Sequence, residues 1–138
     1  MSTIVIIDGD QLQFSTQFGD STVTPTGSLR INGSGEATIT DKKICIVGDE
    51  TKVSVAASYI KGAFTTPGNG TITIASLAAD QQAVFATAQT PVIVKGSQFT
   101  ALFTPQTPAQ NALGQPDPPS PAIGSGNFIN TQSFVTAG

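Results

Sequence analysis

The sequence has no histidine and no tryptophan, it has one cysteine, and only 11% of its 138 residues are charged. Histidine is the side chain most often used for proton transfer near neutral pH, so most acid–base mechanisms lack their usual group here. One cysteine excludes an intramolecular disulfide, and one thiolate cannot provide the four nitrogen or sulfur ligands of a structural zinc site. We therefore expect a protein that is not an enzyme and that holds no zinc and no other cofactor.

Basic residues are also scarce. The formal net charge is -3, so the sequence offers no basic stripe that could neutralise the phosphates of a nucleic acid, and we expect no nucleic-acid binding. The first residues lack a basic flank and a long apolar run, and no segment reaches the length of a membrane span. We expect synthesis in the cytoplasm without a signal peptide. The six basic residues are Arg30, Lys42, Lys43, Lys52, Lys61 and Lys95.

Residues 27–74 contain short runs of β-branched residues separated by glycine-containing turns. Alternating apolar and polar side chains predict strands with one buried face. Asn32-Gly33 lies between two such runs and predicts a hairpin, and Pro67-Gly68-Asn69-Gly70 predicts a second reversal of the chain. We therefore expect a mainly β fold, a compact body of short strands and glycine-rich turns. The structural turn residues of this interpretation are Gly27, Asn32, Gly33, Gly48, Gly68 and Gly70.

One short helix is expected within this β-rich body. Ser76 can cap a helix over residues 76–88, in which Leu77, Val84 and Phe85 recur at helical spacing. Pro91 ends this helix, and strand character resumes after it. The alternation over residues 98–103 places two phenylalanines on one face of a strand.

The composition changes after residue 103. Six of the nine prolines lie at residues 105–121, and this segment carries one charged residue, Asp117. Proline lacks the N–H group that regular structure needs, so we expect none here. The sequence predicts a β-rich body over residues 1–103 and an extended proline- and glycine-rich tail over residues 104–138. The tail is either disordered or docked on a surface through its few apolar side chains.

Three short motifs look like chemical sites, but each has a simpler explanation. Asp8-Gly9-Asp10 lacks the further acids and the final glutamate of a calcium loop, so a turn is favoured. Asp49 and Glu50 are adjacent, which in a strand places them on opposite faces, and a solvated turn is favoured. Cys45 lies in an apolar run and is interpreted as a small buried hydrophobe rather than a nucleophile. We identify no catalytic, cofactor-binding or metal-binding residue.

Three segments carry a resemblance to a known family: residues 27–33 (GSLRING), the pair Glu36-Ala37 and residues 43–49 (KICIVGD). They combine an alternating strand, an Asn-Gly turn and, at the place of the family's small-residue pair, Glu36-Ala37, ahead of a Gly-Asp turn. This pattern resembles the spike-tip proteins of contractile injection systems, which are the proline-alanine-alanine-arginine (PAAR) repeat proteins and their divergent PAAR-like relatives. The similarity extends through residues 67–70 and 95–97 to about residue 103.

The resemblance implies a small cone of short strands whose base caps a trimeric β-helical spike, one tip per trimer, and whose apex leads the puncturing of a target membrane. It implies a structural protein of a type VI secretion apparatus or a phage-tail-like particle, delivered outside the cell or into a target cell, that can also carry effector cargo. Typical members hold zinc near the apex through histidines and a cysteine. This chain lacks those histidines and the Pro-Ala-Ala-Arg signature, so we expect a tip held by side-chain packing.

A second class of function fits the same composition. A small β-sandwich or fibre-type binding module could use polar threonine and asparagine faces to recognise a surface glycan or a protein. The two classes differ in stoichiometry, because a tip binds as one copy to a threefold spike, whereas a fibre-type module self-associates or binds a soluble ligand.

Overall fold

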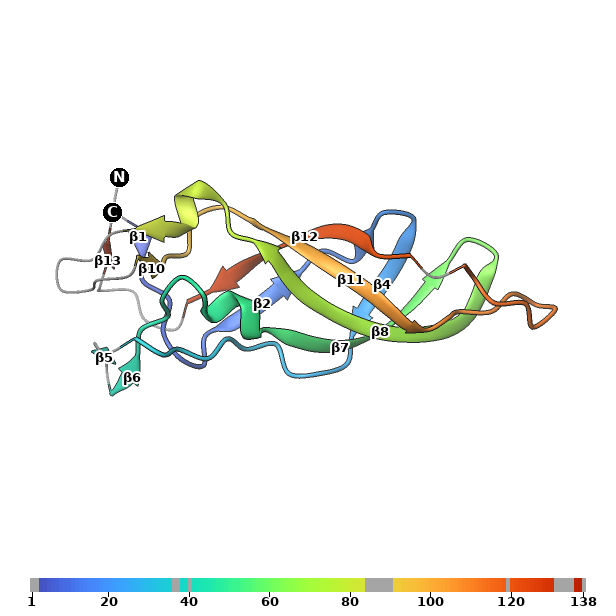
Figure 1. Cartoon of the computed structure of the whole chain (residues 1–138), viewed down its shortest axis with the longest axis horizontal. Helices are drawn as coiled ribbons and strands as arrows, with labels where there is room; N and C mark the ends of the chain where they lie inside the picture. Colours follow the sequence, from blue (N-terminus) through green and yellow to red (C-terminus); the bar gives the residue numbers. More distant parts are fainter. Residues whose placement is uncertain are drawn as a thin grey trace.

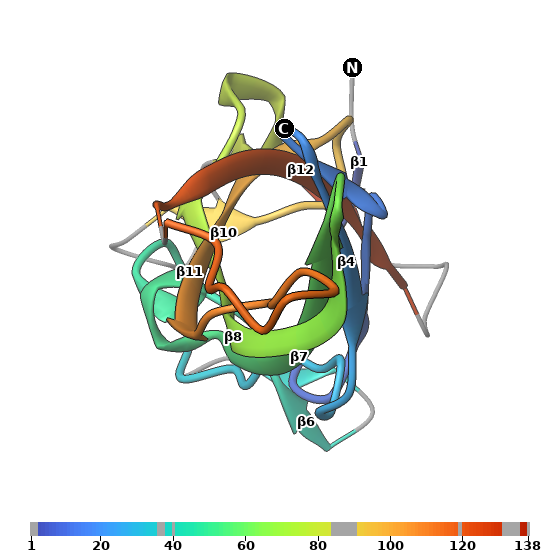
Figure 2. The ribbon, with the colours of Figure 1, turned by 90° about the vertical axis from the view of Figure 1, so that its right-hand side faces the viewer.

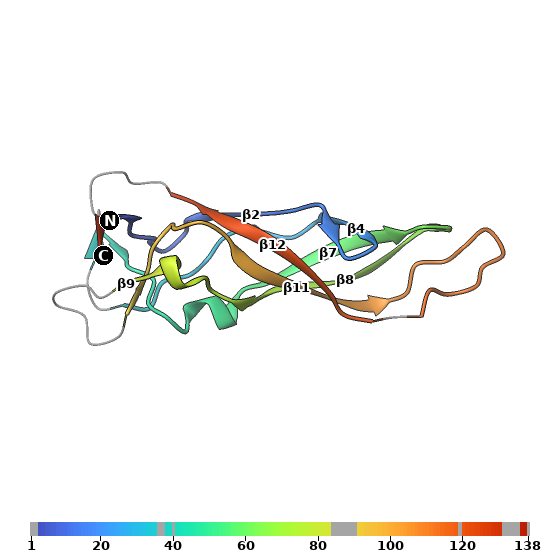
Figure 3. The ribbon, with the colours of Figure 1, turned by 90° about the horizontal axis from the view of Figure 1, so that it is seen from above.

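The computed structural model describes residues 3–35, 38–39, 41–83, 91–118, 120–130 and 136–137. The molecule is elongated and tapers from a broad end, where β1 (Thr3–Ile4) pairs with β13 (Thr136–Ala137), to a narrow end made of loops (Figure 1, Figure 3). Its fold is mainly β, which confirms the predicted fold class. In the described residues, helical structure is limited to two 3-10 turns, η1 (Asp49–Lys52) and η2 (Ala79–Gln81).

The body is a seven-stranded antiparallel sheet that curls around the long axis as a half-barrel (Figure 2). Residues 26–31 cross the open side of this half-barrel, where the Gly27 amide donates to the Ala56 carbonyl (3.0 Å) and the Leu12 amide donates to the Leu29 carbonyl (2.9 Å). In spatial order the strands are β2 (Gln11–Phe14), β12 (Ala122–Ile129), β11 (Phe99–Thr107), β8 (Phe64–Ser76), β7 (Ser54–Lys61), β4 (Ser21–Pro25) and β3 (Gln17–Phe18).

The chain leaves the broad end and returns toward it three times, and we call these three segments the arms. Arm 1 covers residues 11–29 and contains β2, β3 and β4. Arm 2 covers residues 53–79 and contains the β7–β8 hairpin, and arm 3 covers residues 98–130 and contains β11 and β12. Each arm has a single charged residue, and all other charged residues of the chain lie outside the arms. The three are Asp20, Lys61 and Asp117.

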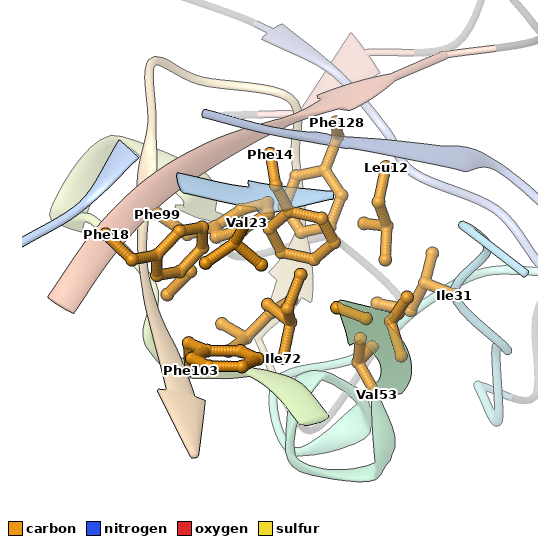
Figure 4. Packing of buried hydrophobic residues seen from close by; sticks show 14 of the residues in the cluster. Leu12, Phe14, Phe18, Val23, Ile31, Val53, Ile72, Phe99, Phe103 and Phe128 are labelled. Atoms are coloured by element: carbon orange, nitrogen blue, oxygen red, sulfur yellow. The ribbon is translucent and has the colours of Figure 1, made fainter. Parts of the chain in front are cut away.

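The inner face of the half-barrel is packed with aromatic and aliphatic side chains from all three arms (Figure 4). Alternate residues along β11 are buried, so Phe99, Ala101 and Phe103 share the inner face, as the alternation predicts. The Phe103 ring lies 6.3 Å from the Phe18 ring and 5.1 Å from the Tyr59 ring, centroid to centroid. Burial of these rings holds the arms together.

The expectation of no regular structure in the proline-rich segment 105–121 fails at residues 105–107, and the sequence-predicted tail also contains a strand that the sequence did not predict. Strand β11 continues to Thr107, and β12 lies inside the sheet between β2 and β11. The Gly124-Ser125-Gly126 run within β12 reads as a loop, yet its glycines are needed under aromatic rings. A Cβ atom at Gly124 would lie 2.6 Å from the Phe18 ring, and one at Gly126 would lie 2.6 Å from the Phe99 ring. The division into a body and a tail stays a prediction.

The hairpin predicted at Asn32-Gly33 is also wrong. The segment before Asn32 pairs with the start of arm 1 instead of with the segment that follows it, because the Ile31 amide donates to the Asp10 carbonyl (3.0 Å). The Gly33 amide donates to the Asp8 carboxylate (2.9 Å). Glycine is required at residue 33 by close packing, since its Cβ atom would lie 2.6 Å from the Lys43 carbonyl oxygen.

The reversal predicted at residues 67–70 lies elsewhere. Strand β8 runs straight through Gly68 and Gly70, which pair with Tyr59 and Ala57 of β7, and the chain reverses at Gly62-Ala63, where Gly62 has φ +54°. The glycines at 68 and 70 mark places where the neighbouring chain passes close by. A Cβ atom at Gly70 would collide with the Thr104 carbonyl oxygen and lie 2.7 Å from the Phe103 ring.

The helix predicted over residues 76–88 is wrong in its described part. Residue 76 ends β8, a 3-10 turn occupies residues 79–81, and β9 (Gln82–Ala83) pairs with β10 (Val92–Ile93). Residues 84–88 lie outside the described residues. Pairing between strands therefore overrides the helical spacing of the apolar residues.

Candidate functional site

Three short segments meet in a closed ring at the broad end. The Ile6 amide donates to the Ile93 carbonyl (3.0 Å), the Ile93 amide donates to the Cys45 carbonyl (2.9 Å), and the Cys45 amide donates to the Ile6 carbonyl (2.9 Å). Each segment thus gives one hydrogen bond and receives one. The ring gives a single chain three similar sides, which is an approximate threefold arrangement.

The residues that flank this ring form a separate apolar cluster. Bridges join Val5 to Val94, Ile7 to Ile44 and Ile46 to Val92, so each segment pairs with both others. Because side chains alternate along an extended chain, Ile6, Cys45 and Ile93 belong to the main core and their neighbours to a second cluster. We call this second cluster the base cluster; its buried members are Val5, Ile7, Ile39, Ile44, Val92 and Val94.

A two-stranded ribbon continues from each side of the ring. The first ribbon is β1 with β13, the second is β5 (Thr38–Ile39) with β6 (Lys42–Lys43), and the third is β9 with β10. All three lie at the broad end (Figure 1, Figure 3). The ring, the base cluster and the three ribbons together form what we call the base.

A glycine turn follows each segment of the ring and leads into an arm. Gly9, Gly48 and Gly96 all have positive φ, at +86°, +116° and +50°, a conformation that glycine adopts without steric cost. In the first two turns a buried carboxylate folds back on the segment. Asp10 Oδ2 accepts from the Ile7 amide, and Asp49 Oδ2 accepts from the Ile46 amide, both at 2.9 Å.

The third turn replaces the carboxylate with an amide from a different segment. Ser97 stands where the other turns have aspartate, and its side chain is exposed and donates to Asp80 (3.1 Å). Gln81 is fully buried and accepts from the Ala78 amide (2.9 Å) and donates to the Lys95 carbonyl (3.2 Å). The threefold arrangement is thus preserved in the backbone and broken in the side chains.

The three segments share a short repeat that the sequence reasoning missed. Residues 4–10 (IVIIDGD), 43–49 (KICIVGD) and 91–97 (PVIVKGS) each have a central apolar triplet and a glycine at the sixth place. The signal is weak, because only a glycine and the apolar character of the triplet recur over seven residues. Aligning them would have predicted both the ring and the turns.

Asp49 and Cys45, two residues of the short motifs that look like chemical sites, are both buried. Asp49 is buried and also accepts from the amide (3.0 Å) and hydroxyl (2.6 Å) of Ser34, so its assignment to a solvated turn is wrong. Burial raises the pKa of the Cys45 thiol far above its ordinary value, and the negative charges of Asp49, Asp10 and Asp8 raise it further. The thiol therefore stays protonated and unreactive at neutral pH.

The predicted turn residues are divided between different environments. Gly48 lies in the second turn of the base, and Gly33 contacts the same segment at the Lys43 carbonyl. Gly27, Gly68 and Gly70 lie in or against the walls of the half-barrel. The structure brings only the first two to the base.

Two observations on the described residues concern ligand and metal binding. An open groove of about 470 Å³ lies beside β2, and its lining has no carboxylate, hydroxyl or thiol; the lining residues are Gln11, Leu12, Gln13, Gly27, Leu29, Arg30 and Ile129. Within the described ranges, no three histidine, cysteine, aspartate or glutamate residues gather closely enough to hold a metal ion. That the protein holds no zinc stays a prediction. In the same part of the chain, no helix has the length and apolar character needed to span a membrane.

Comparison with protein families connects this arrangement to a known class. A family model described as "Contractile injection system spike tip protein" matches residues 1–138. The chain belongs to this spike-tip family. The resemblance carried by residues 27–33 and 43–49 is thereby confirmed, and the spike tip is a component that associates with a spike in a contractile injection system. A comparison with curated proteins gives no significant match.

Proposed function

We propose that the base docks as a single copy on the end of a trimeric β-helical spike and that the narrow end leads through the target membrane. The observation that carries this proposal is the closed ring of hydrogen bonds among Ile6, Cys45 and Ile93. A trimer presents three equal chain ends around one axis. A single chain can satisfy all three only if it offers three similar segments, and the ring and its ribbons supply them.

The chemistry of the base suits such a contact. Each ribbon has only two strands, and in this proposal the chain ends of the spike join the ribbons by strand addition. The base cluster is buried within the tip and holds the three segments together, so the spike would contact the ribbons and not these side chains. In this arrangement the tip continues the spike and adds a tapered body beyond it.

The proposal assigns a mechanical function and no catalysis. The absence of histidine supports this assignment, as does the burial of the Cys45 thiol with its strongly raised pKa. The apparatus is a type VI secretion system or a phage-tail-like particle, in which contraction supplies the energy and the tip concentrates the force. Carriage of effector cargo belongs to the same proposal.

The test is the mass of the complex between the purified chain and the spike protein of its own particle. We expect one tip per spike trimer by native mass spectrometry. A matched pair of variants locates the contact: Lys42→Glu changes an exposed residue of the second ribbon, and Thr104→Glu changes an exposed residue of arm 3. Lys42→Glu should weaken the complex, and Thr104→Glu should leave it intact.

Three results would overturn the proposal. Three tips per trimer would contradict docking of one chain on all three spike ends. Loss of binding in Thr104→Glu with full binding in Lys42→Glu would place the contact on the body. Self-association without spike binding would favour the fibre-type module instead.

A further inference from the structure

The loop between β11 and β12 forms the narrow end of the molecule (Figure 1, Figure 3). It contains Leu113, whose exposed fraction is 82%, the highest among the exposed large hydrophobic residues of the described chain. The others, Ile60, Ile123 and Ile129, range from 38% to 58%. A single exposed leucine is common on protein surfaces and has significance only if the turn that holds it has a fixed shape.

The turn that holds Leu113 is closed by Asn111. The Asn111 Oδ1 atom accepts from the Leu113 amide (3.0 Å) and the Gln115 amide (2.9 Å), and its Nδ2 atom donates to the Gln115 side chain (3.0 Å). The backbone closes the same turn, because the Asn111 amide donates to the Gln115 carbonyl and the Gly114 amide donates to the Asn111 carbonyl, both at 3.0 Å. Leu113 is therefore presented by a turn of defined geometry.

The residues on both sides of this turn are hydrogen-bonded to the body. Thr66 and Gln110 exchange two backbone hydrogen bonds of 3.0 Å. The buried Tyr59 hydroxyl accepts from the Ala109 amide (3.0 Å) and donates to Asp117 Oδ2 (3.1 Å). The Asp117 amide in turn donates to the Ala109 carbonyl (2.8 Å). A push on the turn is thus transmitted to β7 and β8 and not absorbed by a loose loop.

The surroundings of the turn are almost free of charge. Residues 98–116 and 118–130 contain no charged side chain. Asp117 is buried and forms an ion pair with Lys61 at 3.7 Å, so the positive charge of arm 2 neutralises the negative charge of arm 3. Transfer of an unpaired charge into hydrocarbon is costly, whereas a paired charge and an apolar side chain enter far more readily. This is the chemistry of a surface that meets lipid.

We propose that Leu113 is the point of first contact with a lipid bilayer and that its side chain enters the acyl-chain region. The assignment rests on the proposed function for the direction of travel, with the narrow end leading. The partner is the bilayer itself, since the turn offers an apolar point and no charged rim by which a protein receptor would orient it. Asn111 closes the turn that presents the exposed leucine.

The chain has no tryptophan, so Leu113→Trp creates a unique fluorophore. The full-length variant is mixed with phosphatidylcholine vesicles with and without brominated acyl chains. We expect a blue shift of the emission and quenching by the brominated lipid. The matched control is Thr51→Trp, at an exposed residue of η1 near the base, and it should show neither effect.

A label-free measurement removes the contribution of the tryptophan itself. In vesicle flotation, Leu113→Gln should bind about tenfold less than the unchanged protein, because each buried methylene contributes to partitioning. Leu113→Phe should bind at least as well as the unchanged protein. Spike binding is measured on the same variants and should not change. If the unchanged protein binds lipid but does not bind the spike, the proposed function is overturned and the lipid contact is not.

Three results would overturn the lipid contact. The first is equal quenching, or no quenching, in Leu113→Trp and Thr51→Trp. The second is vesicle binding of Leu113→Gln that equals that of the unchanged protein. The third is a blue shift that requires outer-surface proteins of a target cell in the vesicles and is absent from pure lipid.

Discussion

The base and the arms are stabilised by different chemistry although one chain builds both. The base cluster is aliphatic, and the base contains buried carboxylates that accept backbone amides at the turns. Every described aromatic residue lies in the arms, and each arm contains one charged residue. The polar end is the one that is proposed to dock on the spike, and the nearly uncharged end is the one that is proposed to meet lipid.

This difference arises because the chain has two separate apolar clusters, one mainly in the arms and one in the base. Short ribbons bury few side chains, so the base depends on a ring of backbone hydrogen bonds and on satisfied buried polar groups. The arms have longer strands and depend on rings that pack against glycines, as Phe103 does against Gly70. If this comparison is right, changes in packing should damage the arms, and changes in polar contacts should damage the base.

The largest effect is expected from Gly70→Val in the arms. The new side chain would collide with the Thr104 carbonyl and the Phe103 ring, so the reason is close packing and not a positive φ. We expect a loss of roughly 3 kcal/mol or more in the free energy of unfolding. Denaturant unfolding measures it, with Thr71→Val on the outer side of β8 as the control that should change little. An unchanged midpoint in Gly70→Val would contradict the packing of arms 2 and 3.

The next largest effect is expected in the base from Asp49→Ala. The substitution removes the charged acceptor of three part-buried hydrogen bonds, from the Ile46 amide, the Ser34 amide and the Ser34 hydroxyl. We expect a loss of about 2.5 kcal/mol. Gln81→Ala is the counterpart in the third turn, where a neutral amide is lost, and should cost about 1 kcal/mol. Equal losses would show that the side chains of the three turns are equivalent.

Much of the fold class was predictable, because strand patterning depends on nearby residues. The buried face of β11 and the turn at Asp8-Gly9-Asp10 follow from local alternation and glycine. What failed depends on distant residues. Four glycines look like turn glycines in the sequence but lie in strands, where an aromatic ring or a neighbouring chain packs against them. They are Gly68, Gly70, Gly124 and Gly126. Strand β12 was missed for the same reason.

The base was less predictable than the body. Its ring joins residues that lie roughly 40 to 90 positions apart in the chain, and each segment alone reads as an ordinary apolar strand. The family resemblance found the turn at Gly48 and the segment before it, but not the threefold pairing. Only the recurrence of a glycine three residues after each central apolar residue carries that information.

Alkaline pH should weaken the base. The folded-state pKa of Cys45 is raised above its ordinary value of 9.0, so the folded protein keeps its proton when the unfolded chain loses it. This stability is fully present below pH 9 and is lost as the pH rises toward the folded-state pKa. By pH 10 the loss should reach about 1.4 kcal/mol. Denaturant unfolding at pH 8 and pH 10 measures it, and Cys45→Ala should abolish the difference. The same slope in Cys45→Ala would assign it to another group.

Tyr59→Phe tests two buried hydrogen bonds that fasten the narrow end to β7. The variant keeps the ring against Phe103 but removes the acceptor of the Ala109 amide and the donor to Asp117. We expect a loss of about 1 kcal/mol, concentrated in residues 109–117. Hydrogen exchange at the Ala109 amide should rise while exchange at Ile6 and Ile93 stays unchanged. Faster exchange throughout the molecule would show that base and arms unfold together.

The smallest effect is expected from Lys61→Met, which removes the cation of the Lys61–Asp117 pair. The lysine side chain is 31% exposed and its Nζ atom lies 3.7 Å from the carboxylate, so water screens much of the attraction. We expect a loss of about 0.5 kcal/mol that shrinks further in 1 M salt. Asp117 keeps its bond to the Tyr59 hydroxyl, which is why the loss should be small. A loss above 2 kcal/mol would mean that the narrow end depends on charge as much as the base does. The contrast between the two regions would then fail, and with it the reason to regard the narrow end as suited to lipid.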